Sequence, residues 1–265
     1  MKDIPLMRKM MALFLLLILI PSLCFGFFTF SKGIGDYVQD VVDDAQDVLQ
    51  TMKAGIEAQG AIVENNLALL SYDESLLAFL NSDWKTAGQR IVLQIYQVGE
   101  RIDYSCLFLK DMEARITLYA SFENFMESYY SIMDLSHIEG SADYQAFCAQ
   151  GSAFAWVGMD WARPTDVGRY DLNNFRAFIC FREVYANLSK TKGVLKCAIR
   201  PSALFALVDE WPGEDEVFVL RDGEWIYGDA VAVDAPLAGQ TQKFTLQEGN
   251  FVFVGVPVDK LGIFL

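Results

Sequence analysis

The segment from Ile34 to Leu70 reads IGDYVQDVVDDAQDVLQTMKAGIEAQGAIVENNLALL, and it sets the architecture of the chain. Its apolar residues recur every three or four positions, which is the spacing of one face of an α-helix. Asp and Gln fill the opposite face, and only Gly55 and Gly60 weaken the pattern. The segment predicts one helix of about ten turns, which packs along a domain or pairs with its own copy in a dimer. The apolar stripe consists of Val38, Val41, Val42, Ala45, Val48, Leu49, Met52 and Ile56.

Upstream of this helix, residues 11–30 read MALFLLLILIPSLCFGFFTF and carry no charge. A bilayer core about 30 Å thick needs roughly 20 apolar helical residues, so this run is long enough to span one. Lys2, Arg8 and Lys9 precede the run, and this basic flank predicts that residues 1–10 are cytoplasmic. We therefore expect a single-pass protein of the cell membrane, with an extracellular C-terminal domain.

A cleaved signal peptide is the alternative, because it also combines a basic start with an apolar run. Cleavage needs small residues near the site, whereas the sequence after Leu19 is bulky and apolar. A lipid-attachment site at Cys24 would need a small residue where Leu23 stands. The residues favour the uncleaved anchor.

The charge of the remaining chain restricts the classes of partner. Beyond the cytoplasmic leader there are 18 basic and 34 acidic residues, a net charge of −16. Nucleic acid needs a basic surface, and anionic lipid attracts basic segments, so neither is an expected ligand. The acidic excess is typical of a solvated surface.

The cysteines outside the apolar run lack the close spacing of a zinc site. Cys106, Cys180 and Cys197 lie in apolar runs and are interpreted as small buried hydrophobes. A disulfide involving these residues or Cys148 stays open, because the sequence cannot select a pairing.

Beyond the long helix, the hydrophobic period alternates between helix and strand. Ser71 and Glu74 have the spacing of a capping box before the short helix SLLAFLN. Further helices are predicted over Trp84–Gln97, Phe122–Asp134, Ala142–Gln150 and Pro201–Glu210. Strands are predicted over Tyr104–Leu109, Arg115–Ser121, Ala153–Met159, Phe175–Tyr185 and Gly193–Ile199.

The last fifty residues contain two predicted hairpins. DEVFVLRDGEWIYGDA turns at Asp222–Gly223, and KFTLQEGNFVFVGVPV turns around Glu248–Gly249–Asn250. Together with the long helix, the two antiparallel-sheet units predict an α+β fold, with the seam near Trp211–Gly213. The expected core residues are Phe178, Cys180, Val194, Leu195 and Ile199 in the first sheet, and Val217, Val219, Phe251 and Phe253 in the second.

This layout resembles the exported sensor region of YesM-type bacterial sensor histidine kinases. The resemblance rests on the basic leader, the apolar run with LLILIP, the long helix and the closing strand FVFVGVPVDKL. Its most specific stretch is Phe181–Tyr227, with FREVYANLSKTKGVLKCAIRPSALFALVDE and GEDEVFVLRDGEWIYG. The resemblance implies a double Cache fold, in which two PAS-like modules follow a long helix. The implied organisation is a leader (1–10), a transmembrane helix (11–30), a stalk with helices (31–100), a membrane-distal module (101–211) and a membrane-proximal module (212–265).

The sequence departs from this family in its output. It has one histidine, His137 in DLSHIEG, which we interpret as a loop residue and not as a phospho-acceptor. The expectation is a sensor region whose parent is a histidine kinase, truncated before its second membrane span, or a sensor expressed without its output.

The segment from Trp156 to Arg176 is the candidate ligand site, because it concentrates aromatic, acidic and basic residues between two predicted strands. Aromatic walls with a few directed polar groups suit a small-molecule pocket. The residues predicted to line it are Trp156, Asp160, Trp161, Arg163 and Arg176. The Tyr–Arg–Trp–Tyr–Asp order of amino-acid-binding double Cache sensors is missing, which weakens the amino-acid hypothesis. The resemblance implies a sugar, because sensors of the YesM type are commonly tied to carbohydrate uptake. An ordinary polar loop with core tryptophans is the alternative.

No catalytic residues, metal ligands or cofactor-binding motif stand out. One histidine does not make a catalytic triad, and no glycine-rich phosphate loop follows a strand. The predicted function is ligand sensing for a transmembrane receptor, with a homodimer formed through the long helix. The alternatives are the sensor of a chemoreceptor and an anchored protein-interaction domain without a small ligand.

Overall fold

The computed structural model describes residues 6–82, 89–121, 131–161, 176–185, 193–211, 216–221, 224–228, 244–248 and 251–265. A long N-terminal helix is followed by mixed helices and sheets, which confirms the α+β class. The chain divides into two compact units. One combines Met1–Val48 with Thr245–Val254, and the other combines Leu49–Phe244 with Gly255–Leu265.

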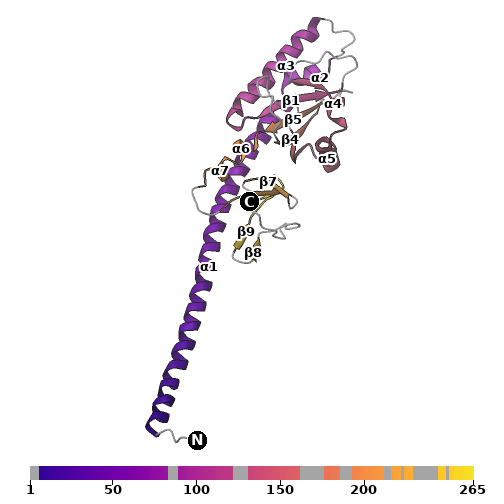
Figure 1. Cartoon of the computed structure of the whole chain (residues 1–265). Coiled ribbons are helices and arrows are strands. Elements are labelled where there is room, and N and C mark those ends of the chain that lie inside the picture. Colours follow the sequence, from indigo (N-terminus) through magenta and orange to yellow (C-terminus); the bar gives the residue numbers. More distant parts are fainter. Residues whose placement is uncertain are drawn as a thin grey trace. The chain divides into compact units, whose positions relative to one another are not determined.

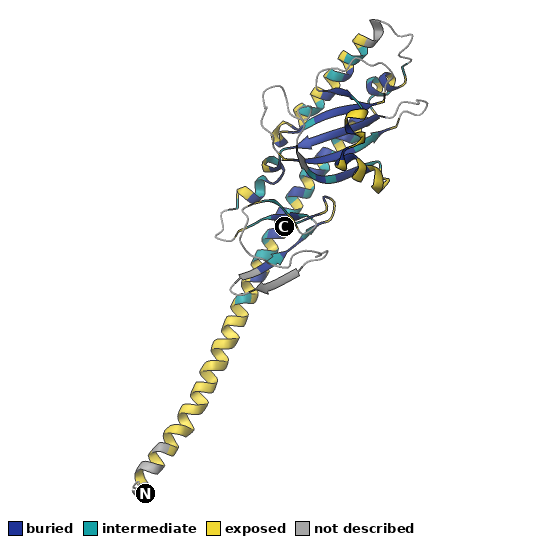
Figure 2. Ribbon diagram, turned by 45° about the vertical axis from the view of Figure 1, so that its right-hand side comes forward, coloured by how far each residue is buried: buried dark blue, intermediate teal, exposed yellow. Residues whose placement is uncertain are grey.

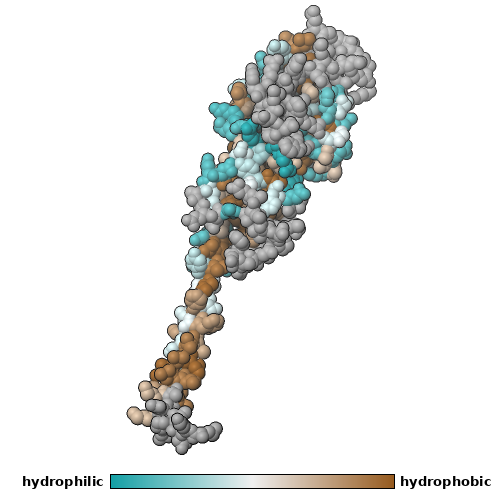
Figure 3. All heavy atoms as spheres, in the orientation of Figure 1, coloured by the Kyte–Doolittle hydropathy of each residue, from teal (hydrophilic) through white to brown (hydrophobic). Residues whose placement is uncertain are grey.

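Helix α1 runs without interruption from Leu6 to Ser71, so the predicted apolar helix and the long amphipathic helix are one element (Figure 1). It is the one helix in the described ranges that is long and apolar enough to cross a membrane. Its first part is exposed in Figure 2 and forms the brown apolar surface near the N-terminus in Figure 3. Apolar exposure on this scale is compatible with a membrane anchor.

Two hydroxyl groups in this part are satisfied within the helix. Ser22 Oγ donates to the Ile18 carbonyl and Thr29 Oγ1 donates to the Phe25 carbonyl, each at 2.8 Å. Pro21, which lacks an N–H, lies inside the helix. A bilayer tolerates a helix only when its polar groups have such internal partners, so these bonds suit a spanning segment.

From Leu49 onward, α1 packs one face against the second unit. Leu49, Met52 and Ile56 of the predicted stripe are buried here. The two glycines are points of close approach: a Cβ on Gly55 would collide with Leu207, and one on Gly60 would lie 3.2 Å from Leu261 Cδ1. Their small size brings neighbouring elements close to the helix axis.

Helix α2 spans Glu74–Leu80, as predicted, but its cap differs. Ser71 is still helical and donates to the Ala68 carbonyl, so it cannot cap the next helix. Asp73 is the N-cap, and its Oδ1 accepts from the N–H groups of Ser75 and Leu76. The Ser71–Glu74 capping box was therefore wrong, because α1 continues past the residue that would have ended it.

Helix α3 spans Gln89–Phe108, and this overturns the strand predicted over Tyr104–Leu109. Val98, Ile102 and Leu109 are buried and recur at helical spacing, which continues the helix face through the apolar run. The periodicity of a short apolar run is compatible with both a strand and a buried helix. In this segment the tertiary packing stabilises the helix. The 3₁₀ turn η1, Lys110–Met112, follows.

The second unit contains a five-stranded sheet in the order β2-β1-β5-β4-β3. All its pairs are antiparallel except β1 with β2. The strands are β1 (Arg115–Ala120), β2 (Ile132–Asp134), β3 (Phe154–Trp161), β4 (Arg176–Val184) and β5 (Gly193–Ile199). Four of them correspond to predicted strands. The helix predicted over Phe122–Asp134 was wrong at its end, since Ile132–Asp134 pairs with β1, and residues 122–130 lie outside the described ranges.

The two faces of this sheet are both covered, as Figures 1 and 2 show. Helices α1 and α3 lie on one side, and the short helices α4 (Ser136–Glu139) and α5 (Ala142–Gln150) lie on the other. Helix α5 has the predicted bounds. The predicted core residues of the sheet, Phe178, Cys180, Val194, Leu195 and Ile199, are all fully buried, which confirms the prediction.

The cysteines that follow α1 differ in how far they are buried. Cys180 and Cys197 are buried on facing positions of β4 and β5, as predicted for small hydrophobes. Cys106 is only partly buried, but burial of its sulfur raises the pKa of its thiol to about 11. Cys148 is exposed.

The predicted helix over Pro201–Glu210 is divided into α6 (Pro201–Leu204) and α7 (Ala206–Asp209). Phe205 interrupts it with a non-helical backbone and is fully buried. Its ring lies 5.7 Å from that of Phe178 in β4 and 5.3 Å from that of Tyr227. The break therefore coincides with a large ring that packs against both sheets of this unit.

The last segment forms two small sheets. One has the order β10-β11-β6-β7, and the other pairs β8 (Phe244–Glu248) with β9 (Phe251–Gly255). Strands β6 (Val219–Arg221) and β7 (Glu224–Tyr227) pair antiparallel with Arg221 opposite Glu224, the register expected for the predicted hairpin. Strands β10 (Pro257–Val258) and β11 (Ile263–Phe264) complete the first sheet.

The predicted core of this last segment is confirmed in part. Val219 and Phe253 are buried, whereas Val217 is only half-buried. The side chain of Phe251 and the turn residues 222–223 and 249–250 lie outside the described set. The predicted seam near Trp211–Gly213 stays a prediction.

Candidate functional site

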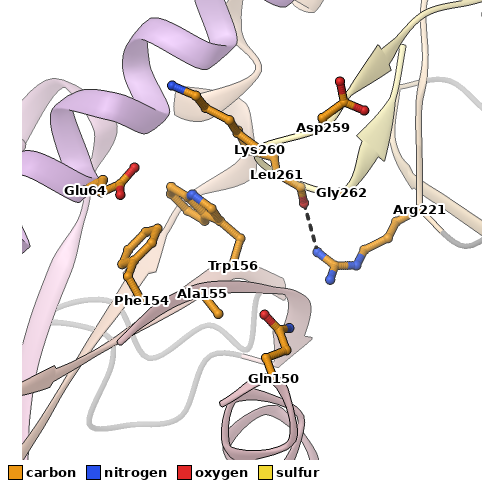
Figure 4. Close-up of a pocket in the computed structure, with 10 residues that line it drawn as sticks. All are labelled: Glu64, Gln150, Phe154, Ala155, Trp156, Arg221, Asp259, Lys260, Leu261 and Gly262. Atoms are coloured by element: carbon orange, nitrogen blue, oxygen red, sulfur yellow. Dashed lines mark hydrogen bonds between the residues drawn. The ribbon is translucent and has the colours of Figure 1, made fainter. Parts of the chain in front are cut away.

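A cavity of about 470 Å³ lies where α1, β3 and the four-stranded sheet meet in the second unit (Figure 4). Strand β3 provides an aromatic wall, α1 contributes one carboxylate, and the turn between β10 and β11 closes another side. We call it the junction cavity. Its lining consists of Glu64, Gln150, Phe154, Ala155, Trp156, Arg221, Asp259, Lys260, Leu261 and Gly262.

Trp156 is fixed in this wall by ring packing. Its ring lies 5.4 Å from that of Phe178 and 5.7 Å, edge to face, from that of Phe154. Its Cζ2 atom lies 3.7 Å from the point where Gly60 of α1 would carry a Cβ. Only 7% of Trp156 is exposed, so the residue joins α1 to the sheet and offers a ligand little more than its edge.

Arg221 lies across a bulge in β3. The register between β3 and β4 shifts between Trp156 and Gly158, and Gly158 has a φ of 105°. A Cβ on Gly158 would lie 2.9 Å from Arg221 Nε, so the guanidinium occupies the space that the glycine leaves. Arg221 Nη1 also donates to the Leu261 carbonyl at 3.2 Å. Figure 4 shows this bond at the edge of the cavity.

The junction cavity carries charges of both signs. Asp259 Oδ2 lies 3.9 Å from Lys53 Nζ on α1, a bridge on the exposed side. Glu64 is half-buried and Lys260 is exposed. Neither forms an ion pair with any residue that the structure describes. The cavity therefore presents a carboxylate from α1, and both the carboxylate of Asp259 and the cationic groups of Arg221 and Lys260 from the last segment.

A second cavity, of about 290 Å³, lies between the end of the five-stranded sheet and β7. We call it the arginine cavity, because Arg176 and Arg200 both line it. Arg200 Nε lies 2.7 Å from Glu113 Oε2, which neutralises part of its charge. The other lining residues are Met159, Pro201, Ser202, Ile226 and Tyr227.

Tyr227 is fixed by a hydrogen bond at the rim of this cavity. Its hydroxyl donates to Asp209 Oδ2 at 2.6 Å. Burial of the ring, together with this bond and the charge of Asp209, raises the pKa of the Tyr227 hydroxyl. The phenol stays neutral at physiological pH and holds α7 against β7.

A buried ion pair lies on the face of the five-stranded sheet that α5 covers. Lys196 of the central strand β5 places its Nζ 3.2 Å from Asp143 Oδ2 of α5, and the two side chains are 1% and 4% exposed. Burial by itself would raise the pKa of Asp143. The charge of Lys196 and hydrogen bonds from Ser141 and the Tyr144 N–H outweigh burial and lower this pKa.

The structure does not bring the predicted site residues into one cavity. Trp156 lines the junction cavity and the exposed Arg176 lines the arginine cavity. Asp160 and Trp161 pair with Ala177 and Arg176 at the end of β3, but their side chains are outside the described set. Arg163 lies outside the described residues altogether.

Sequence reasoning missed Glu64 and Arg221, because each looks like an ordinary surface residue of a helix or hairpin. One available signal was Gly158, since a lone glycine inside a strand pattern points to a bulge or a close approach. Within the described ranges, no three His, Cys, Asp or Glu side chains are placed to hold a metal ion.

The similarity to a known protein comes from the comparison of structures. No protein-family profile and no curated protein matches the sequence. The fold resembles a crystal structure of the extracellular domain of "the putative histidine kinase vpHK1S-Z8", with a TM-score of 0.59 and 12% sequence identity. The match covers 86% of this chain and 94% of that one. The long helix and the sheets that follow it are thus the fold of the extracellular domain of that protein.

Proposed function

We propose that this chain is the extracytoplasmic sensing region of a transmembrane signalling receptor, most simply a two-component histidine kinase. One observation carries the proposal: α1 is a single helix that contains both a membrane-length apolar run and the face packed on the sheet. In this proposal, α1 is the path by which a change at the sheet reaches the membrane. The shared fold with a histidine kinase extracellular domain supports this assignment.

The proposal includes the double Cache organisation. The five-stranded sheet belongs to the membrane-distal module (101–211), and the strands from β6 onward belong to the membrane-proximal module (212–265). Residues 1–10 are cytoplasmic, 11–30 span the membrane, and 31–100 form the stalk and its helices. Signalling requires a ligand that binds two arrangements of α1 with unequal affinity.

The sensed ligand binds in the distal module, at the β3–β4 end that contains Asp160, Trp161, Arg163 and Arg176. Arg176 supports this placement because it lines the arginine cavity and has no ion-pair partner among the described residues. Trp156 contributes from the same strand by holding β3 on α1. Guanidinium and carboxylate groups beside an aromatic ring suit the hydroxyl groups and C–H face of a sugar.

A homodimer through α1 completes the proposal. The exposed face of α1 in the second unit carries Ala58, Ile62, Asn65 and Leu69, alternately four and three residues apart. This is the seam spacing of a coiled coil. The neighbouring helix α3 adds exposed Tyr96, Tyr104, Leu107 and Phe108.

The topology is tested by fusing, after Gly33, a reporter enzyme that is active only outside the cytoplasm. Activity is expected, and its absence would overturn the orientation. A mature protein that starts near Phe25 would show a cleaved signal peptide in place of the anchor.

The ligand is tested with the full chain in lipid nanodiscs, using thermal unfolding with a panel of sugars. A binding sugar should stabilise the wild type and lose at least about tenfold in affinity in Asp160→Ala, because a charge-assisted hydrogen bond is worth roughly 1.5–3 kcal/mol. Equal stabilisation of the Asp160→Ala, Arg176→Ala double variant would exclude this site.

The second candidate function is an anchored protein-interaction domain, favoured by the exposed aromatic face of α3. It predicts that no sugar stabilises the chain. It also predicts that the double variant Tyr104→Ser, Phe108→Ser no longer binds its protein partner, while its free energy of unfolding is unchanged.

A further inference from the structure

We propose that Leu207 couples the arginine cavity to α1, so that occupancy of this cavity changes the local stability of α1 around Gly55. The inference rests on the proposed function, because it takes the arginine cavity as the site of the sensed ligand. It goes further by naming the segment that carries the change, which is α6 followed by α7, Pro201–Asp209.

One end of this segment lies at the arginine cavity. Pro201 and Ser202, the first two residues of α6, line the cavity. Tyr227 lines it too, and its hydroxyl donates to Oδ2 of Asp209, the last residue of α7, at 2.6 Å. A ligand in the cavity therefore meets α6 directly and reaches α7 through Tyr227.

The other end of the segment contacts α1, beside which α6 and α7 lie in Figure 1. A Cβ on Gly55 would collide with Leu207 Cδ1 and would lie 3.8 Å from Leu207 Cγ. The Leu207 side chain thus fills the space that the glycine leaves on the helix. A glycine inside a helix makes it less stable, because the glycine backbone gains more freedom when the helix opens. Leu207 covers α1 at this less stable position, so its withdrawal should let the helix open more readily there.

The segment between the two ends is held together as one unit. Phe205, which separates α6 from α7, donates its N–H to the Pro201 carbonyl, and its own carbonyl accepts from the Val208 N–H, each at 2.8 Å. The buried ring of Phe205 also packs on the ring of Tyr227. Closely packed groups transmit a displacement to their neighbours. A shift of α6 at the cavity should therefore move Leu207 on the surface of α1.

This arrangement provides the difference in affinity that signalling requires. A ligand that displaces α6 binds best when Leu207 is withdrawn from Gly55, and α1 is then less stable at this point. Gly55 lies on the same continuous helix as the membrane-length apolar run. The change in α1 is thus made on the element that leads to the membrane.

The test measures hydrogen–deuterium exchange of the α1 amides over residues 49–60, with the full chain in lipid nanodiscs. Two variants perturb the arginine cavity without any ligand. Ser202→Trp adds a large ring at its wall, and Tyr227→Phe removes the hydrogen bond to Asp209. Each should speed exchange over this stretch by at least about fivefold, the lower end of typical coupling between sites.

The same two variants are then combined with Leu207→Ala. In this background neither should change the exchange of α1 further, because the contact through which they act is gone. Leu207→Val, which shortens the side chain by one carbon, takes the place of Leu207→Ala if that variant does not fold. Ser136→Trp is the matched control, since Ser136 is an exposed serine in the first turn of another short helix and lines neither cavity. It should exchange like the wild type.

Unchanged exchange in both cavity variants would overturn the coupling. Equal acceleration with and without the Leu207 side chain, or an effect of Ser136→Trp as large as that of Ser202→Trp, would overturn it as well. No sugar is used in this experiment, so its outcome does not depend on whether a sugar binds. The sugar assay with Asp160→Ala and Arg176→Ala can therefore fail while the coupling holds, and the coupling can fail while a sugar binds.

Discussion

The guanidinium of Arg221 rests on Gly158: Arg221 Nε lies 2.9 Å from the point where a Cβ on this residue would stand. Gly158 has a φ of 105°, a conformation that other residues adopt only with strain. Gly158 allows this contact in two ways. It adopts the positive φ of the bulge, and its lack of a side chain leaves space for the guanidinium of Arg221. Through this contact β3 of the larger sheet meets β6 of the smaller one.

Gly158→Ala should destabilise the protein by about 1–3 kcal/mol, because it adds backbone strain and displaces Arg221. Urea unfolding of the full chain measures the effect. Gly99→Ala is the matched control: Gly99 lies within α3 and a Cβ there would meet no atom within 4 Å. This control should stabilise by about 0.5–1 kcal/mol through helix propensity. Equal effects of the two changes would show that the bulge has no structural role.

Asp143→Asn should destabilise by about 3–5 kcal/mol, because it leaves the buried Lys196 charge without its counterion. The pH dependence follows from the lowered pKa of Asp143. The carboxylate contributes its full stability above the ordinary pKa of 3.8, and this contribution is lost as the pH falls through the lower folded value.

Thermal unfolding from pH 7 to about pH 2 checks this dependence, because the contribution of the carboxylate is lost only below its ordinary pKa of 3.8. The wild type should lose stability on acidification, and the double variant Asp143→Leu, Lys196→Met should lose less, since it contains no buried charge at this position. An identical acid response in both proteins would contradict the assignment.

Phe178→Ala should cost about 3–5 kcal/mol, because Phe178 is fully buried and its ring contacts those of Trp156 and Phe205. Tyr185→Ala, at an exposed position one residue beyond β4, should change stability by no more than about 0.5 kcal/mol. Chemical denaturation measures both. A cost below about 1 kcal/mol at Phe178 would mean that the inward face of β4 is wrongly assigned.

Much of the fold could be predicted from sequence because its elements have strong local signals. The period of α1, the apolar runs of β4 and β5 and the hairpin register at Arg221–Glu224 depend on neighbouring residues only. The errors fell where tertiary contacts decide. The predicted strand over Tyr104–Leu109 is helical from Tyr104 to Phe108, and Ile132–Asp134 is a strand that pairs with β1.

The site was harder to predict for the same reason. Glu64 and Arg221 line the same cavity, at a place where Gly60 and Gly158 allow α1 and the small sheet to approach β3 closely. Neither residue lies in a motif, and the concentration of aromatic and charged residues near Trp156 pointed instead to one loop. The local composition indicated the strand that contains Trp156. It did not indicate the residues from other elements that line the cavity with it.

Cysteines placed on the exposed seam of α1 should cross-link two copies of the chain if the homodimer forms through this helix. Ile62→Cys and Leu69→Cys stand seven residues apart on that seam, and both native side chains are more than half exposed. The background requires Cys24→Ser and Cys148→Ser, because these two native thiols are exposed. Mild oxidation in membranes should give a disulfide-linked dimer for each seam variant on non-reducing gels.

Ala61→Cys is the control, because Ala61 adjoins Ile62 but lies about 100° around the helix and is half-buried. A thiol at this position points away from the seam and should give little dimer under the same oxidation. Efficient cross-linking at Ala61, or none at Ile62 and Leu69, would contradict a parallel pairing of α1. Because the seam pairs identical residues across a two-fold axis, both seam variants should respond together. Cross-linking of only one would indicate a chance collision instead of an interface.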